Sequence, residues 1–164
     1  MLYGQAVDQA RRPAFYAGLG VPDTLDGRFD MVALHVFLLL HRLKREGQAQ
    51  GAVGQALFDI MFADMDGGLR EMGVGDLSVG RKIKQMATGF YGRVAAYEAG
   101  LAGDGPALEE ALRRNLYGTV APAPGQVTAM ARYVRGQAAH LAQQPAADLI
   151  RGRASFQKPA EGST

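Results

Sequence analysis

The segment Ser78–Leu101, SVGRKIKQMATGFYGRVAAYEAGL, carries the clearest structural pattern in the chain. Its large apolar residues recur at steps of three or four positions: Val79, Ile83, Met86, Phe90, Val94, Tyr97 and Leu101. Residues with this spacing share one face of an α-helix. The segment therefore predicts a long amphipathic helix, with Ser78 as its expected N-cap.

The same periodicity continues on both sides of this segment. Helices are predicted over five further segments: 2–11, 30–45, 53–72, 106–114 and 127–141. Asp30 is the expected N-cap of the second of them. Because no strand alternation or repeat is present, the expected fold is all-α, a single compact domain of about six to seven helices in an orthogonal or irregular bundle. We expect the domain to cover residues 1–150 and the polar segment 151–164 to be a disordered basic tail.

The composition allows one folded core and removes several kinds of chemistry. The chain has 164 residues, of which 48% are hydrophobic and 21% are charged, enough for one domain. It contains no Cys, which excludes disulfides, thiolate zinc sites, iron–sulfur clusters and a cysteine nucleophile. The net charge is +2, and residues 105–160 hold seven basic and three acidic side chains. Since this basic third lacks the dense basic and aromatic stripe of nucleic-acid binders, DNA is not an expected partner.

Two features of the sequence bear on location. The longest apolar run, Met31–Leu40, is shorter than the roughly 20 residues that span a bilayer. The first residues, Met1–Gln5, lack the charged region and apolar stretch of an export signal. The expected location is therefore cytoplasmic, with peripheral attachment to the inner face of the cytoplasmic membrane as an open alternative.

The polar residues form no recognisable catalytic or metal site. His35 and His41 are six positions apart, which places them on different faces of a helix and excludes a ligand pair. His35 is flanked by apolar residues, so we interpret it as a hydrogen-bonded core histidine. The stretch Asp64-Met65-Asp66-Gly67 lacks the third carboxylate and the terminal Glu of a calcium loop. We therefore expect no enzyme, no metal, no cofactor and no small-molecule substrate.

Asp64 leaves two alternatives open. It lies seven positions after Leu57, on the apolar stripe of its helix, and a carboxylate in such a place needs a partner. The partner is either a structural hydrogen bond or ion pair, for example with an arginine or with His35, or a group on another protein.

A basic cluster leaves alternatives open as well. Arg81, Lys82 and Lys84 lie near the start of a predicted helix, where the helix dipole disfavours cations. Either the preceding acids neutralise the cluster through surface ion pairs, or the cluster receives an acidic segment of another chain.

Glycine is unusually frequent, with 22 residues in the chain. Several of these, including Gly67, Gly68, Gly89 and Gly92, lie inside predicted helices. A helical glycine costs about 0.5–1 kcal/mol relative to alanine. Their repeated use therefore predicts close helix crossings, with a groove for an apolar partner as the alternative.

A long part of the sequence resembles a known family. The segment Ala63–Lys84, followed by Met86 and Phe90-Tyr91-Gly92-Arg93, closely resembles the ubiquinol–cytochrome c chaperone family. Leu34-His35-Val36-Phe37 and the entry segment Tyr3–Pro22 resemble it too, so the likeness covers most of residues 3–142. With no Trp and no targeting leader, the chain looks like a bacterial member.

The resemblance implies a function. Members of the family are helical assembly factors rather than enzymes, and they bind newly made cytochrome b during construction of the cytochrome bc1 complex, complex III of the respiratory chain. Mitochondrial relatives act with a small partner protein near the ribosomal exit tunnel. The implied partner is therefore cytochrome b as the client, and the ribosome or the inner face of the membrane are further candidates.

The residues and the resemblance together suggest a partner-binding region. An apolar groove would be lined by Met61, Met65, Met72, Met86 and Phe90. Its polar edge would be formed by Asp64, Asp66, Arg70, Glu71, Asp76, Ser78, Arg81, Lys82 and Lys84. The alternative function is a basic peripheral adaptor module that binds a membrane surface or the ribosome through Arg113, Arg114, Arg132, Arg135, Arg151 and Arg153.

Overall fold

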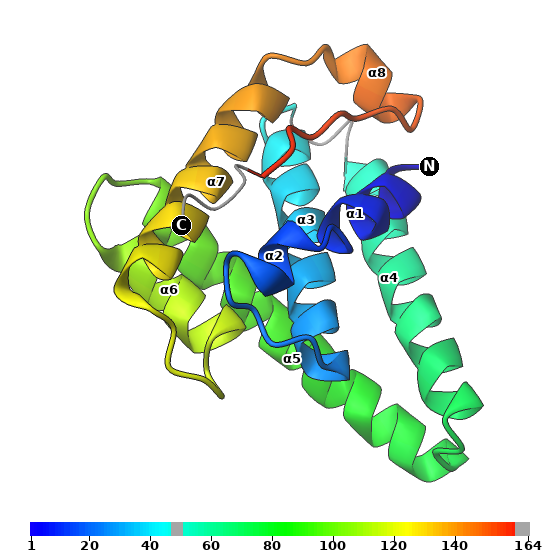
Figure 1. Ribbon diagram of the computed structural model, residues 1–164. Helices are drawn as coiled ribbons and strands as arrows, with labels where there is room; N and C mark the ends of the chain where they lie inside the picture. Colours follow the sequence, from blue (N-terminus) through cyan, green and yellow to red (C-terminus); the bar gives the residue numbers. More distant parts are fainter. Residues whose placement is uncertain (47–50, 160–164) are drawn as a thin grey trace.

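The computed structural model describes residues 1–46 and 51–159, and these residues form helices and loops without a strand (Figure 1). The helices are α1 (Leu2–Ala10), α2 (Ala14–Ala17), α3 (Leu25–Lys44), α4 (Gly51–Glu71), α5 (Asp76–Leu101), α6 (Ala107–Leu116), α7 (Pro124–Ala142) and α8 (Ala146–Ile150). Helices α2 and α8 are short, and the other six span nine residues or more. The predicted all-α fold is confirmed.

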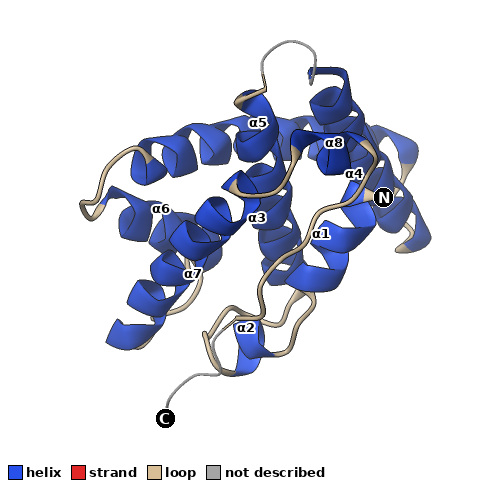
Figure 2. Cartoon of the chain, turned by 90° about the horizontal axis from the view of Figure 1, so that it is seen from above, coloured by secondary structure: helices blue, strands red, loops and turns tan. Residues whose placement is uncertain are grey.

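Helix α3 is the centre of the core. Every residue from Met31 to Leu39 is buried. The helix packs against α1, α4, α6 and α7 and also contacts α5, so that its neighbours cover it from several sides (Figure 2). Because residues 31–39 are covered on all faces, this part of the helix is an almost continuous apolar run instead of an amphipathic pattern.

The start of α3 differs from the prediction. Thr24, not Asp30, caps the helix, because the Thr24 Oγ1 accepts a hydrogen bond from the Gly27 N–H at 3.1 Å. A Cβ on Gly27 would lie 1.9 Å from the carbonyl oxygen of Pro22, so a larger residue does not fit there. Asp30 lies inside the helix and forms an ion pair with Arg93 at 2.7 Å. The predicted cap therefore joins α3 to α5.

Helices α4 and α5 form a helical hairpin whose turn lies far from both chain termini (Figure 1). At its base, Leu57, Met61 and Phe90 are buried in the main core. Beyond the base the two helices mainly cover each other, and Val79 is fully buried without belonging to the main core. We call residues 65–84, which surround the turn, the distal arm. Helix α5 begins at Asp76 after Gly75, so the prediction of Ser78 as its N-cap is wrong.

The glycines named in the prediction do not mark helix crossings, so that prediction is wrong for them. A Cβ added at Gly67, Gly68, Gly89 or Gly92 would meet no other atom within 4 Å. The close crossing lies elsewhere, where a Cβ on Gly100 would come within 2.6 Å of the Leu108 Cα, between α5 and α6. Gly73 has a separate role, because its φ of 85° permits the turn between α4 and α5.

The C-terminal segment also differs from the prediction. Residues 151–159 are not a disordered tail but run between α1 and α7 (Figures 1 and 2). The Gln5 and Gln144 side chains hydrogen-bond to its main chain, and Phe156 packs against the core. Residues 160–164 of the predicted tail lie outside the described residues. The partners of this segment are up to 149 positions away in sequence, so local composition does not reveal them.

Candidate partner-binding site

The turn of the distal arm is held by one arginine. The Arg70 Nε donates to Asp66 Oδ1 at 2.7 Å, and its Nη1 pairs with Asp76 Oδ1 across the turn. The bonds to Asp66 and Asp76 raise the pKa of Arg70. All three side chains are in contact with solvent, which screens the attraction between them. Arg70 therefore sets the geometry of the turn more than its stability.

The basic cluster of Arg81, Lys82 and Lys84 follows this turn on α5. All three side chains are exposed, and none has an ion-pair partner within 4.0 Å among residues 1–46 and 51–159. Asp66 and Asp76 are engaged with Arg70, so these two acids do not pair with the cluster. The cluster is therefore available to an acidic group of another molecule.

The apolar residues of the predicted groove fall into two sets. Met61 and Phe90 are buried in the main core, Met86 is half-buried against it, and Met65 is half-buried, so none of these four side chains lies freely on the surface. Met72, in contrast, is 61% exposed at the end of α4. The structure therefore does not show the open groove that the sequence predicts.

The turn also exposes an apolar residue that the sequence analysis missed as a site residue. Leu77 is 88% exposed in the first turn of α5, close in sequence to Met72 and the basic cluster. Its position on the outer side of the amphipathic pattern, next to charged residues, was the signal in the sequence. Glu71 and Ser78 are exposed beside these two apolar side chains.

An aromatic cluster joins the two helices at the base of the arm. Phe58 and Phe62 lie 4.6 Å apart between ring centroids, Phe58 stacks on Tyr91 at 5.5 Å, and Phe62 meets Phe90 edge-on at 6.0 Å. Such pairs contribute about 0.5–1.5 kcal/mol beyond the burial of their surface. The cluster fixes the direction in which the arm leaves the core. Phe58 and Phe62 are one helical turn apart, which is the pattern that could have identified it.

Asp64 makes a structural hydrogen bond. The hydroxyl of Tyr3 donates to Asp64 Oδ2 at 2.5 Å and joins α1 to α4. Burial raises the pKa of Tyr3, and the bond to Asp64 raises it further, so the hydroxyl keeps its proton. Of the two alternatives left open for Asp64, the structure has the structural hydrogen bond, and its partner is a tyrosine and not an arginine or His35.

His35 is the hydrogen-bonded core histidine that the sequence predicts. Its Nδ1 lies 2.8 Å from the carbonyl oxygen of Met31 and its Nε2 lies 2.8 Å from the hydroxyl of Tyr133. Because a carbonyl only accepts, Nδ1 carries the proton, and Nε2 accepts from Tyr133. Burial lowers the pKa of His35 to about 4, so the ring is neutral at pH 7.

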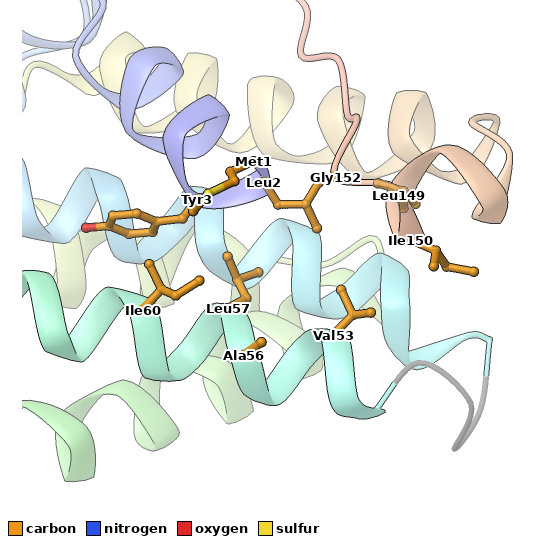
Figure 3. A pocket seen from close by; sticks show the side chains of 10 residues that line it. All are labelled: Met1, Leu2, Tyr3, Val53, Ala56, Leu57, Ile60, Leu149, Ile150 and Gly152. Carbon is orange, nitrogen blue, oxygen red and sulfur yellow. The ribbon is translucent and has the colours of Figure 1, made fainter.

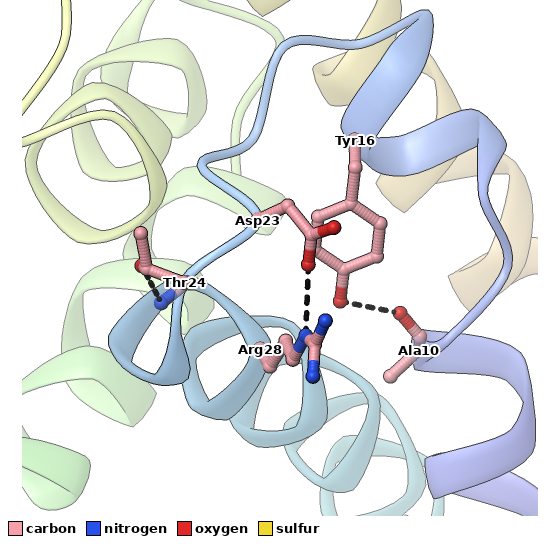
Figure 4. Close-up of polar contacts among 6 residues, drawn as sticks. Ala10, Tyr16, Asp23, Thr24 and Arg28 are labelled. Atoms are coloured by element: carbon pink, nitrogen blue, oxygen red, sulfur yellow. Dashed lines mark hydrogen bonds and ion pairs between the residues drawn. The ribbon is translucent and has the colours of Figure 1, made fainter.

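Two pockets lie away from the distal arm. One is an apolar depression of about 140 Å³ between α1, α4 and α8, lined by residues such as Leu2, Leu57 and Leu149 (Figure 3). The other has about 250 Å³ and is polar: Arg28 pairs with Asp23 at 2.8 Å, and Tyr16 donates to the carbonyl oxygen of Ala10 at 2.9 Å (Figure 4). Neither pocket shares a residue with the predicted site.

Within the described part of the chain, no group of three or more His, Asp or Glu side chains is arranged to hold a metal ion. The helices in that part also include none with the length and apolar character needed to cross a bilayer.

These features define an all-helical protein with a projecting hairpin, an exposed pair of apolar residues and an unpaired basic cluster, a geometry typical of a protein that binds other proteins. The chain belongs to the family described as ubiquinol-cytochrome C chaperone, whose sequence profile matches residues 17–156. The predicted family membership is thereby confirmed.

Relatives of known identity agree with this assignment. The chain is 27% identical to the ubiquinol-cytochrome c reductase complex assembly factor 1 of Mus musculus over 149 residues, which cover 91% of this chain and 50% of the mouse protein. It is 28% identical to the corresponding Xenopus laevis protein, with 91% and 74% covered. The chain thus spans about half the length of the mouse relative. Its fold matches the crystal structure of a Cbp3 homologue from Brucella abortus with a TM-score of 0.87 and 39% identity, over 99% of this chain and 90% of the other.

Proposed function

We propose that this chain is a non-enzymatic assembly chaperone that binds newly made cytochrome b and supports assembly of ubiquinol–cytochrome c reductase, the cytochrome bc1 complex. The family and the names of the relatives support the connection to this complex. The observation that carries the binding mode is the distal arm, where Met72 and Leu77 are 61% and 88% exposed beside three unpaired cations.

The chemistry of the distal arm suits such a client. A cytochrome b that has not yet joined its partner subunits exposes apolar helices, and burying one Met or Leu side chain against them yields about 1.5–3 kcal/mol. Methionine is flexible and fits irregular apolar surfaces. The basic cluster adds attraction for acidic residues of the client and sets the orientation of binding. A client embedded in the membrane would place the chaperone at the inner face of that membrane.

The alternative function, a basic adaptor for a membrane or the ribosome, is less well supported by the arrangement of its arginines. Arg113 and Arg114 lie in α6, which precedes α7, whereas Arg151 and Arg153 follow α8 at the other end of α7. Helix α7 has 19 residues, which at about 1.5 Å per residue separates the two groups widely. Arg132 and Arg135 of the same set lie in α7 between these two groups, so the six arginines are spread along the molecule and are not gathered at one place. We therefore retain the chaperone as the proposed function.

Co-expression with tagged cytochrome b tests the proposal. For the variant with Arg81→Glu, Lys82→Glu and Lys84→Glu, the amount of chain that co-purifies with tagged cytochrome b should be at least tenfold lower than for the unchanged chain. A matched control carries Arg113→Glu, Arg114→Glu and Arg132→Glu, the same change of charge at exposed positions of α6 and α7. The control should co-purify normally. Equal recovery of both variants would remove the distal arm as the binding site, and no recovery of the unchanged chain would contradict the proposed function itself.

A further inference from the structure

The C-terminal segment is held by side chains that bind its backbone. Residues 152–157 run between α1 and α7 after a turn at Gly152, and four glutamines contact their main chain (Figure 1). We call these four residues, Gln5 and Gln9 of α1 and Gln137 and Gln144 near or beyond the end of α7, the glutamine cradle.

The hydrogen bonds follow the backbone of the segment residue by residue. The Gln144 amide pairs with both main-chain groups of Ser155, accepting from its N–H at 2.9 Å and donating to its carbonyl oxygen at 2.8 Å. The Gln5 amide accepts from the Ala154 N–H at 2.7 Å and donates to the Gly152 carbonyl oxygen at 3.0 Å. This pattern resembles the addition of a strand to a sheet edge, except that side-chain amides take the place of the neighbouring strand.

Gln157 is bound in the same way by the two buried members of the cradle. Its N–H donates to Gln137 Oε1 at 2.9 Å, and its carbonyl oxygen accepts from Gln9 Nε2 at 2.7 Å. Gln9 and Gln137 are only 4% and 2% exposed. Their low exposure includes the cover that the segment itself provides, so the segment both shields these two amides and completes their hydrogen bonds.

Hydrogen bonds to Arg12 and Tyr133 hold the side chain of Gln9, one member of the cradle, in position. Gln9 Oε1 accepts from the Arg12 Nε at 2.8 Å, and Gln9 Nε2 donates to the Tyr133 hydroxyl at 2.9 Å. Tyr133 in turn is bonded to the buried His35. These contacts leave the second N–H of the Gln9 amide directed at the segment, so this member of the cradle is already oriented to bind a peptide backbone.

The aromatic side chain of the segment, Phe156, packs against a buried ring of the core. The Phe156 ring meets the His35 ring edge-on, with centroids 5.4 Å apart and an angle of 83°. The only other polar side-chain contact of residues 152–157 in the described structure joins the Ser155 Oγ to His140 Nε2 at 3.1 Å, and it is exposed. Recognition therefore depends on the main chain, on the Phe156 ring and on the small Ala154 side chain, which also packs against the core.

We propose that the glutamine cradle is a binding site for an extended segment of another protein that carries an aromatic residue, and that residues 152–157 occupy this site in its absence. The site is separate from the distal arm and does not rest on the function proposed for that arm. Displacement by a partner would exchange one set of main-chain hydrogen bonds for an equivalent set, so a partner segment with better aromatic contacts would be favoured.

A labelled peptide with the sequence of residues 151–159, RGRASFQKP, tests this site in the full chain. The attached segment has an effective concentration on the order of millimolar, so the unchanged chain should bind the peptide weakly. The variant Phe156→Ala weakens the attached segment and leaves the cradle intact. It should bind the peptide at least tenfold more tightly than the unchanged chain, and a peptide with Ala in place of Phe should not show this gain.

Matched variants locate the binding. In the Phe156→Ala chain, the further change Gln144→Ala should reduce peptide affinity at least tenfold. Gln143→Ala, at an exposed neighbour whose side chain has no hydrogen bond in the structure, should leave the affinity unchanged. Equal affinities of the two double variants, or no gain from Phe156→Ala, would overturn the proposal.

Hydrogen exchange gives a readout that needs no variant. In the unchanged chain, millimolar peptide should accelerate exchange of the Ala154, Ser155 and Gln157 amides, which donate to the cradle. No acceleration would count against a displaceable segment. A dimeric unchanged chain whose monomer does not bind the peptide would show that copies exchange the segment with each other, and would also overturn the proposal.

Discussion

At the scale of single residues, the structure uses polar side chains to join helices that are far apart in sequence. Tyr3 and Asp64 join α1 to α4, Asp30 joins α3 to α5, and Arg42 joins α3 to the end of α7. The buried Arg42 donates to the carbonyl oxygens of Leu141 and Gln144 at 2.9 and 2.8 Å, which satisfies groups that the end of a helix leaves free. Hydrogen bonds and ion pairs are directional, so these contacts specify which helix faces meet. Apolar packing alone is less selective.

His35 makes the stability of the protein dependent on pH. Its pKa is about 4 in the folded chain and about 6.5 when unfolded, so the unfolded state binds more protons between these values. The contribution of His35 is complete above pH 6.5 and is lost as the pH falls toward 4. We expect the free energy of unfolding to decrease by about 2 kcal/mol from this residue between pH 7.5 and pH 5.

Urea denaturation of the unchanged chain and of His35→Gln at both pH values measures this effect. The variant is less stable at pH 7.5, but its loss of stability on acidification should be smaller by the His35 contribution. Parallel pH dependences of the two proteins would show that His35 is not the titrating group.

At the scale of helices, the hairpin carries its glycines on surfaces without neighbours. Gly67→Ala and Gly89→Ala should therefore each raise the free energy of unfolding, by about 0.5–1 kcal/mol, because alanine restricts the unfolded chain and no atom lies within 4 Å of the new Cβ. Gly100→Ala should lower it, because its Cβ would come within 2.6 Å of the Leu108 Cα. Thermal and urea denaturation check both signs, and a loss of stability for all three variants would contradict the open environment of the first two.

The helices were predictable because their apolar residues repeat with the helical period, and this holds even for α5, the longest. The N-caps of the helices were less predictable than the helices themselves. Thr24 and Gly75 cap α3 and α5 in place of the predicted Asp30 and Ser78, because several residues near each helix start can act as a cap and the path of the preceding chain determines which one does. For the candidate site, the sequence suggested which residues to consider but did not predict how far each side chain is exposed to solvent. Met61 and Met72 look alike in sequence, and only the packing of the hairpin buries one and exposes the other.

At the scale of the whole molecule, the features that escaped prediction are those that depend on distant parts of the chain. The segment 151–159 is polar, and its hydrogen bonds come from Gln5, Gln9, Gln137 and Gln144, so nothing local marks it as ordered. The direction of the distal arm likewise follows from how α4 and α5 leave the core. Together these features give a compact body from which the distal arm projects, with the glutamine cradle between α1 and α7.

The body and the distal arm should differ in local stability. Val79 is fully buried but lies outside the main core, whereas Leu38 is fully buried in α3 at its centre. Val79→Ala removes roughly 1–3 kcal/mol of packing from the arm alone. Because the arm can open without unfolding the body, hydrogen exchange of residues 65–84 should accelerate while the amides of α3 keep their protection.

Leu38→Ala is the contrasting variant, because it removes packing that every part of the core shares. It should lower the free energy of global unfolding by about 2–5 kcal/mol and accelerate exchange of the most protected amides throughout the body. If Val79→Ala accelerated the amides of α3 as strongly as Leu38→Ala does, the arm and the body would unfold as one unit. Opening of the arm would also increase the exposure of Met65, which is half-buried when α4 and α5 are packed together.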